Sequence, residues 1–140
     1  MEIKPSNPKD IISIKKIPFN LIPKNVLAEV SLAFLEGSRK YRAYNWRVAG
    51  VRSSVYLDAL DRHLGAWLNG EDIDPDSGLS HIVKAIACLI ILRDSMMIGN
   101  LNDDRPPSLK NGWVQELNKK AGEIIDKYPE GLEPYTEKNK

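Results

Sequence analysis

The chain has 140 residues, which suits a single domain, since one hydrophobic core is typical up to about 150 residues. Its 42% hydrophobic and 28% charged residues are typical of a soluble globular protein and exclude disorder along the whole chain. The net charge of +1 hides an asymmetry. Residues 1–52 are basic, with ten Lys or Arg and four Asp or Glu, whereas residues 53–78 are acidic, with one Arg and six Asp or Glu.

Cysteine usage and hydropathy point to a cytoplasmic protein without a membrane partner. The lone Cys88 excludes an internal disulfide, and the beginning of the chain has no secretory signal pattern. The most apolar run, residues 82–98, is interrupted by Lys84, Arg93 and Asp94. It therefore falls short of the roughly 18 uncharged residues of a membrane span, and we predict a buried helix there.

Residues 1–22 are rich in proline, with isoleucines between Pro5, Pro8 and Pro18. Proline at this density blocks a long helix, so we predict an extended N-terminal arm that packs its isoleucines against another surface. Pro23 suits the first turn of a helix, and apolar residues at helical spacing predict that this helix covers residues 24–41.

The segment 39–47 alternates cations with aromatic rings. Such interleaving suits a ligand that has both phosphate and a flat base. The predicted ligand contacts in it are Lys40, Tyr41, Asn45, Trp46 and Arg47. The alternative is a solvated helix end whose Trp46 packs into the core.

Two further helices flank an acidic turn. Ser53 or Ser54 is expected to cap a helix over residues 55–69 that ends at Gly70. Pro75 forces residues 70–78 into a turn, after which Asp76 or Ser77 is expected to cap a helix over residues 79–98.

The helix over 79–98 is apolar on most faces, which a small domain has difficulty covering alone. We therefore expect burial on all sides, completed by self-association into a homo-oligomer. A fourth helix is predicted over residues 112–128, and residues 129–140 form a polar, frayed tail. No strand pattern is convincing, so the predicted fold is an all-α bundle of about four helices within one domain, residues 23–128.

The acidic turn is a candidate metal site. Its aspartates resemble the start of a calcium loop, but Val83 stands where that loop needs a glutamate. Mg²⁺ instead takes one or two carboxylates together with water and phosphate oxygens, and we predict Asp58, Glu71 and Asp74 as its ligands. Capping by Asp74 and Asp76 explains part of the cluster without any metal.

Both histidines flank this turn. An antiparallel helix pair would bring His63 and His81 together, and with Glu71 and Asp74 they are the predicted catalytic residues. The alternative for His63 is a hydrogen-bonded core residue, because it lies on the apolar stripe of its helix. A pI of about 7.8 beside an acidic cluster favours a small phosphorylated ligand over a nucleic acid polymer.

Five motifs, with Ala85 after the fourth, carry a resemblance to a known family. They are, in chain order, Leu21-Ile22-Pro23, Gly37-x-x-Lys40-Tyr41-x-x-x-Asn45-Trp46-Arg47, Asp58-Ala59-x-x-Arg62-His63-Leu64-x-Ala66-Trp67, Gly70-Glu71-Asp72-Ile73-Asp74-Pro75-Asp76-Ser77-Gly78-Leu79-x-His81, and Asp103-Asp104-Arg105-Pro106. Over about residues 15–107 the chain resembles the amino-terminal domain of the dATP/dGTP diphosphohydrolases, which are common in bacteriophage genomes. The resemblance implies an all-α, Mg²⁺-dependent enzyme of the host cytoplasm that converts a purine deoxynucleoside triphosphate to monophosphate and pyrophosphate.

Lys84 departs from this family, which usually has a histidine three residues after the one matching His81. Three functions therefore stay open. In a hydrolase, Lys40, Arg47 and Arg62 would bind the phosphates. In a non-catalytic sponge that sequesters a purine nucleotide or a host antiviral signal, Lys84 would add a cation. In a structural helical oligomer, the Trp and Tyr residues would all belong to the core.

Overall fold

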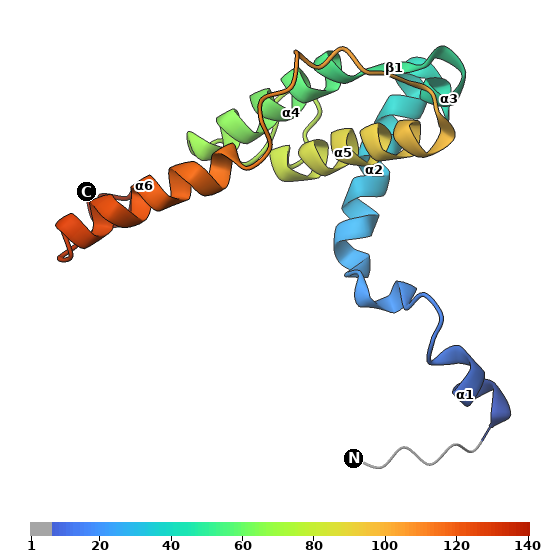
Figure 1. The fold of residues 1–140 in the computed structure, drawn as a ribbon. Coiled ribbons are helices and arrows are strands. Elements are labelled where there is room, and N and C mark those ends of the chain that lie inside the picture. Colours follow the sequence, from blue (N-terminus) through green and yellow to red (C-terminus); the bar gives the residue numbers. More distant parts are fainter. Residues whose placement is uncertain (1–6) are drawn as a thin grey trace. The chain divides into compact units, whose positions relative to one another are not determined.

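The computed structural model describes residues 7–140 and confirms an all-α fold (Figure 1). The elements, in chain order, are α1 (Pro8–Ser13), the 3-10 turn η1 (Phe19–Leu21), α2 (Lys24–Tyr41), α3 (Asn45–Ala49), β1 (Val51–Arg52), α4 (Ser53–Leu68), α5 (His81–Ile98), β2 (Leu101–Asn102) and α6 (Trp113–Lys127). We predicted no strand, but β1 and β2 pair in parallel over two residues each. Helix α3 replaces part of a predicted loop.

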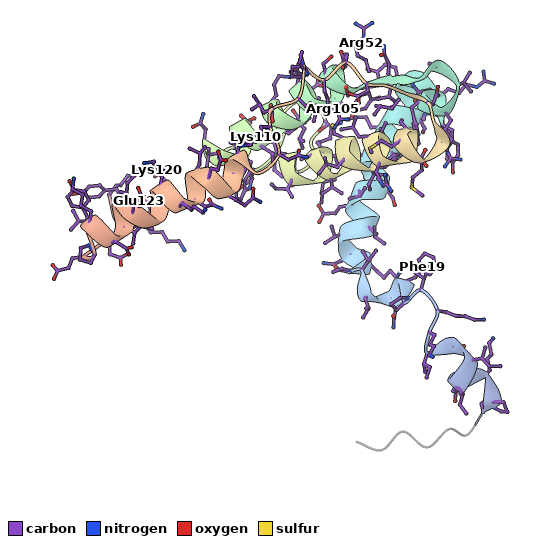
Figure 2. All side chains as sticks on the ribbon, in the orientation of Figure 1. Phe19, Arg52, Arg105, Lys110, Lys120 and Glu123 are labelled. Carbon is purple, nitrogen blue, oxygen red and sulfur yellow. The ribbon has the colours of Figure 1, made fainter. Side chains whose placement is uncertain are left out.

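The chain divides into two compact units, residues 1–104 and 105–140. We predicted one domain over residues 23–128, and the division places its last helix, α6, in the second unit. Within that unit, α6 follows the predicted periodicity, and Lys120 and Glu123 on its polar face are 3.5 Å apart (Figure 2). The predicted domain bounds remain a prediction.

The arm is not fully extended. Pro8 opens α1, and the Asn7 side chain accepts a hydrogen bond from the backbone N–H of Lys9 at 3.0 Å. The extended conformation predicted for this segment is wrong because proline is tolerated in the first turn of a helix, where no N–H is needed. The first six residues of the predicted arm lie outside the described residues. Every residue from 7 to 26 is exposed.

Helix α5 is the centre of the first unit, with α2 and α4 packed on it. Val30 and Ala33 of α2 meet Val83 and Ala87 of α5 in the core. Helix α2 has the predicted bounds. Helix α5 begins at His81 rather than Leu79, because the Ser80 hydroxyl accepts hydrogen bonds from the backbone N–H groups of residues 82 and 83.

The prediction that α5 is buried on all sides is wrong for this chain. Val83, Ala85 and Ala87 are buried, but Leu89 is 49% and Met97 72% exposed, because α2 and α4 cover only part of the helix surface. The self-association inferred from this helix stays a prediction. Within the described part of the chain, no helix combines the length and apolar character needed to cross a membrane.

Helix α4 is capped from a distant part of the chain. We predicted capping by Ser53 or Ser54, yet no side chain at the N-cap makes that bond. The carboxylate of Asp104 instead accepts hydrogen bonds from the Ser54 N–H at 2.8 Å, from the Ser53 hydroxyl at 2.6 Å and from the Ser54 hydroxyl. A carboxylate at a helix N-terminus also meets the positive end of the helix dipole.

Replacing Asp104 by asparagine should lower the melting temperature, because the cap loses its charge and one acceptor. The Ser53 and Ser54 hydroxyls, with the Ser54 N–H, lower the pKa of Asp104 to about 2. Its contribution to stability is therefore present above its ordinary pKa of 3.8 and is lost as the pH falls toward 2. Thermal melts between pH 2 and 7 measure this, with Asp126→Asn, at an exposed position of α6, as control. Equal melting curves for both variants would contradict the capping role.

Candidate functional site

The acidic turn between α4 and α5 is a closed backbone structure. The Asp74 N–H donates to Leu79 O, and the Gly78 N–H donates to Asp74 O, both at 2.8 Å. The Asp74 carboxylate accepts hydrogen bonds from the Asp76 N–H at 3.0 Å and the Ser77 hydroxyl at 2.9 Å. Asp74 thus stabilises the turn without any metal, but the predicted capping of α5 by Asp74, Asp76 or Ser77 is wrong, because the N-cap of α5 is Ser80. Burial acts to raise the pKa of Asp74, but these hydrogen bonds and the nearby imidazoles outweigh it and lower the pKa.

The two histidines meet across this turn, as predicted from the antiparallel pairing of α4 and α5. The Nδ1 atoms of His63 and His81 are 2.8 Å apart, and His81 Nε2 is 2.7 Å from Glu71 Oε1. The His81 ring is buried, whereas the Glu71 side chain is half exposed. These three residues form a continuous hydrogen-bonded chain, which we call the histidine relay.

The hydrogen bonds of the relay fix its protons. An ionised carboxylate only accepts hydrogen bonds, so His81 Nε2 carries the proton that it shares with Glu71. When both rings are neutral, His81 Nδ1 is then an acceptor, and His63 Nδ1 donates to it. This assignment leaves His63 Nε2 with a free electron pair. His63 can therefore act as a base that Glu71 orients through His81.

The electrostatic surroundings keep His63 neutral. Burial lowers the pKa of His63 below its ordinary value of 6.5, and the charges of Lys84 and Arg62 act in the same direction, whereas Asp74 opposes them. A neutral imidazole is the form that accepts a proton. Of the predicted site residues, His63, His81, Glu71 and Asp74 thus lie together, with Arg62 and Lys84 near enough to affect the titration of His63.

A pocket of about 680 Å³ lies along α2, the loop that follows it, and α5. Its volume is in the range of small-molecule sites. Six of the seven predicted substrate contacts line it, namely Lys40, Tyr41, Asn45, Trp46, Arg47 and Lys84. Arg62 does not. The pocket also contains residues that the sequence analysis did not select, among them Glu36, Arg42, Tyr44 and Asp94.

Glu36 holds the two lysines at one end of the pocket. Lys84 Nζ lies 2.6 Å and Lys40 Nζ 3.5 Å from Glu36 Oε1. The hydrogen bond from Lys84, with the charges of both lysines, outweighs burial and lowers the pKa of Glu36. One carboxylate thus fixes two ammonium groups and neutralises one of them.

Asp94 organises the opposite end. Its carboxylate accepts hydrogen bonds from Trp46 Nε1 at 2.7 Å and from Arg47 Nε and Nη2 at 2.9 and 2.8 Å. Arg47 and then Trp46 lower the pKa of Asp94 to about 2. The Trp46 ring is largely buried against Phe34 and beside Tyr44. Trp46 therefore packs into the core, as in the alternative considered for this segment.

Comparison with known proteins assigns the chain to a family. A family model described as the N-terminal part of dATP/dGTP diphosphohydrolase matches residues 6–105. The chain belongs to this family. A dATP/dGTP diphosphohydrolase of Salmonella phage PMBT28 is 32% identical over 98 residues, which are 70% of this chain and 31% of the relative. The chain thus matches less than a third of that relative's length. No solved structure matches it.

The match to the dATP/dGTP diphosphohydrolase family ends at the boundary between the two units, so pocket and relay both lie inside the family domain. Two observations connect them. Lys40 Nζ lies 4.0 Å from Asp76 in the acidic turn, and Lys84 both lines the pocket and affects the titration of His63. The lysine end of the pocket is therefore the end nearest to the relay.

The magnesium site predicted for this family domain does not assemble from its proposed ligands. Among residues 7–140, no group of three His, Cys, Asp or Glu side chains is placed to hold a metal ion. The Glu71 carboxylate bonds to His81, the Asp74 carboxylate closes the turn, and Asp58 lies on the exposed surface of α4. The three carboxylates therefore do not form one group of ligands in the described chain, and magnesium binding stays a prediction.

The rim of the pocket has an unusual backbone. Arg42 (φ +81°) and Tyr44 (φ +59°) are the only residues other than glycine with positive φ in the described chain. Such conformations cost about 1–3 kcal/mol for residues with a side chain and cluster at functional sites. Among the described residues, no ion pair is recorded for Arg42, unlike Lys40, Lys84 and Arg47. The sequence analysis missed Arg42, although it lies within the segment of alternating cations and rings.

Proposed function

We propose that this domain binds a purine deoxynucleoside triphosphate in the pocket and hydrolyses it to the monophosphate and pyrophosphate. The observation that carries the proposal is the convergence of six predicted ligand contacts on one pocket whose lysine end adjoins the histidine relay. The names of the matched family and of its phage relative support the choice of nucleotide.

The chemistry of the pocket suggests the orientation of the nucleotide. Lys84 and Asp94 are ten residues apart on α5, so the two ends are separated by about 15 Å along the helix. That span suits an extended nucleotide. The triphosphate would meet Lys40, Lys84 and Arg42, and the base would lie toward the other end, against the ring of Tyr44 beside Trp46.

The relay would activate the attacking water. In this proposal, His63 Nε2 takes a proton from water, and the oxygen attacks the α-phosphorus atom while the bond to the bridging oxygen of the β-phosphate breaks. The products are the monophosphate and pyrophosphate. Glu71 stabilises the positive charge that His63 gains, acting through His81. Lys40, Lys84 and Arg42 stabilise the negative charge that develops on the phosphates.

Magnesium enters this proposal only with the substrate. Because the described carboxylates do not converge on a resident site, we propose that Mg²⁺ arrives bound to the phosphate oxygens of the nucleotide, a common mode for this ion.

A second candidate function is sequestration of the nucleotide without turnover. It is favoured by Lys84, which stands where we expect a family histidine and whose ammonium group Glu36 holds at 2.6 Å. A fixed cation of this kind binds phosphate but takes no proton from water. This function needs the pocket and not the relay.

Incubation of the pure protein with dGTP or dATP and Mg²⁺ separates the two functions. Hydrolysis predicts that monophosphate and pyrophosphate form in equal amounts, which chromatography measures. The pyrimidine nucleotide dCTP is the control. Sequestration predicts intact triphosphate, recovered after denaturation, together with a raised melting temperature. If no purine nucleotide is hydrolysed or raises the melting temperature, both candidates are wrong.

A further inference from the structure

The N-terminal arm exposes an apolar, basic surface that has no cover within the first unit. Ile14, Ile17 and Leu21 are each about 75% exposed, and Phe19, labelled in Figure 2, is 71% exposed. Residues 7–24 also carry four lysines and one aspartate. Contiguous exposed apolar side chains of this kind mark an interaction surface.

Four helices of the described chain, α2, α4, α5 and α6, expose several apolar side chains, and their charges differ. On α4, Leu57, Asp61, Leu64 and Leu68 follow one another at helical spacing, with Asp58 at the edge. All five are exposed; Leu64 is 41% and Leu68 80% exposed. This outer face of α4, defined by these five residues, is therefore apolar and acidic, although the exposed Arg62 follows Asp58 by one turn at its edge.

The other three helices suit a basic arm less well. The exposed face of α5 has Arg93 between Leu89 and Met97, so it would repel the lysines of the arm. On α6, acidic and basic residues are equal in number, so this helix offers no net attraction. On α2, Val26, Leu32 and Leu35 are exposed, but this helix holds three Lys or Arg against two Glu, so it also repels the arm. Among these four helices α4 alone has more acidic than basic residues, and charge complementarity of this kind selects partners.

We infer that residues 8–22 of one copy dock along the outer face of α4 of a second copy. The isoleucines of the arm cover Leu64 and Leu68, while Lys15 and Lys16 approach Asp58 and Asp61. The arm leads into α2, which packs mainly on α5. Exchange of arms between two copies then covers both arms and both α4 faces in a closed, symmetric assembly. This inference does not depend on the proposed function.

Disulfide trapping tests the exchange directly. In a Cys88→Ser background, the single-cysteine variants Ile17→Cys and Leu64→Cys are mixed and oxidised, and the cross-linked pair is followed on a non-reducing gel. We expect it to form at least about tenfold faster than the pair of Ile17→Cys with Val48→Cys, because a docked arm raises the effective concentration. Val48, on α3, is 90% exposed and lies away from the proposed site. Equal rates for the two pairs would overturn the inference.

Two further measurements separate the remaining outcomes. A chain with both Ile17→Cys and Leu64→Cys should form a disulfide-linked dimer at low concentration. A monomer with an internal disulfide would show that the arm folds back on its own copy, and would overturn the exchange. Lys15→Glu with Lys16→Glu should dissociate the dimer in analytical ultracentrifugation, and adding Asp58→Lys with Asp61→Lys should restore it. A double charge reversal that fails to restore the dimer, although the variant is folded by circular dichroism, would also count against the inference.

Discussion

His63→Ala should lower kcat for dGTP by about 10²–10⁴-fold, the usual contribution of a general base. The expected loss follows from the geometry, because His63 is the residue of the relay whose Nε2 has no partner within it. Nucleotide affinity should change by less than about twofold, since His63 does not line the pocket and acts only during the reaction. Stopped assays for kcat and calorimetry for Kd, with non-hydrolysable nucleotide, measure the two quantities.

Variants of the same relay provide the controls. His63→Asn keeps a hydrogen-bonding group near the Nδ1 position and removes Nε2, so it should retain the fold and lose as much activity as the alanine variant. Glu71 acts through His81 and is a positioning residue; Glu71→Gln should lower kcat less and shift the pH profile. A His63→Asn enzyme with wild-type kcat would exclude His63 as the base.

The pH dependence of the wild-type rate follows from the sign of the His63 shift. The pKa of His63 is lowered from 6.5 by burial, so the base is protonated, and the rate falls, only below pH 6.5. The same shift makes the neutral ring favourable for folding, so its contribution to stability is present above pH 6.5 and is lost as the pH falls. An acidic limb centred above pH 6.5 would contradict this assignment.

Local patterns in the sequence predicted the parts of the site that depend on neighbouring residues. Pro23 and the apolar spacing after it gave the exact bounds of α2, and Pro75 gave the turn that brings His63 and His81 together. The substrate contacts from Lys40 to Arg47 were found because they are contiguous, so wherever the chain places one of them, the others lie close by.

Contacts between distant residues could not be predicted in this way. Asp94 bonds to Arg47, 47 positions away, and Asp104 caps a helix that begins 51 positions earlier. Each is one carboxylate among 19 acidic residues, and nothing local to it indicates its partner. The conformation of Arg42 was equally hidden, because a positive φ is expected at glycine, and arginine gives no sign of it.

Arg42→Gly should stabilise the protein and weaken nucleotide binding at the same time. At φ +81° and ψ +139° the arginine is in a conformation that glycine adopts without strain. Relief of about 1–3 kcal/mol of strain exceeds the roughly 0.5–1 kcal/mol that the added freedom of the unfolded glycine costs, so the melting temperature should rise. Loss of a charged contact worth about 1.5–3 kcal/mol should raise Kd for the nucleotide by about tenfold to a hundredfold.

Two matched substitutions separate strain from charge at this rim. Arg42→Ala removes the guanidinium but keeps a Cβ in the strained conformation, so it should weaken binding as much as glycine does without the gain in stability. Tyr44 has φ +59° and ψ +24°, a conformation that asparagine tolerates. Tyr44→Asn should therefore keep the fold and the binding of phosphate, and should remove only the ring beside Trp46. If Arg42→Gly and Arg42→Ala bind nucleotide like the wild type, the triphosphate does not reach Arg42, and the proposed orientation is wrong. If both bind weakly but neither is more stable, the strain is absent and only the charge of Arg42 serves the site.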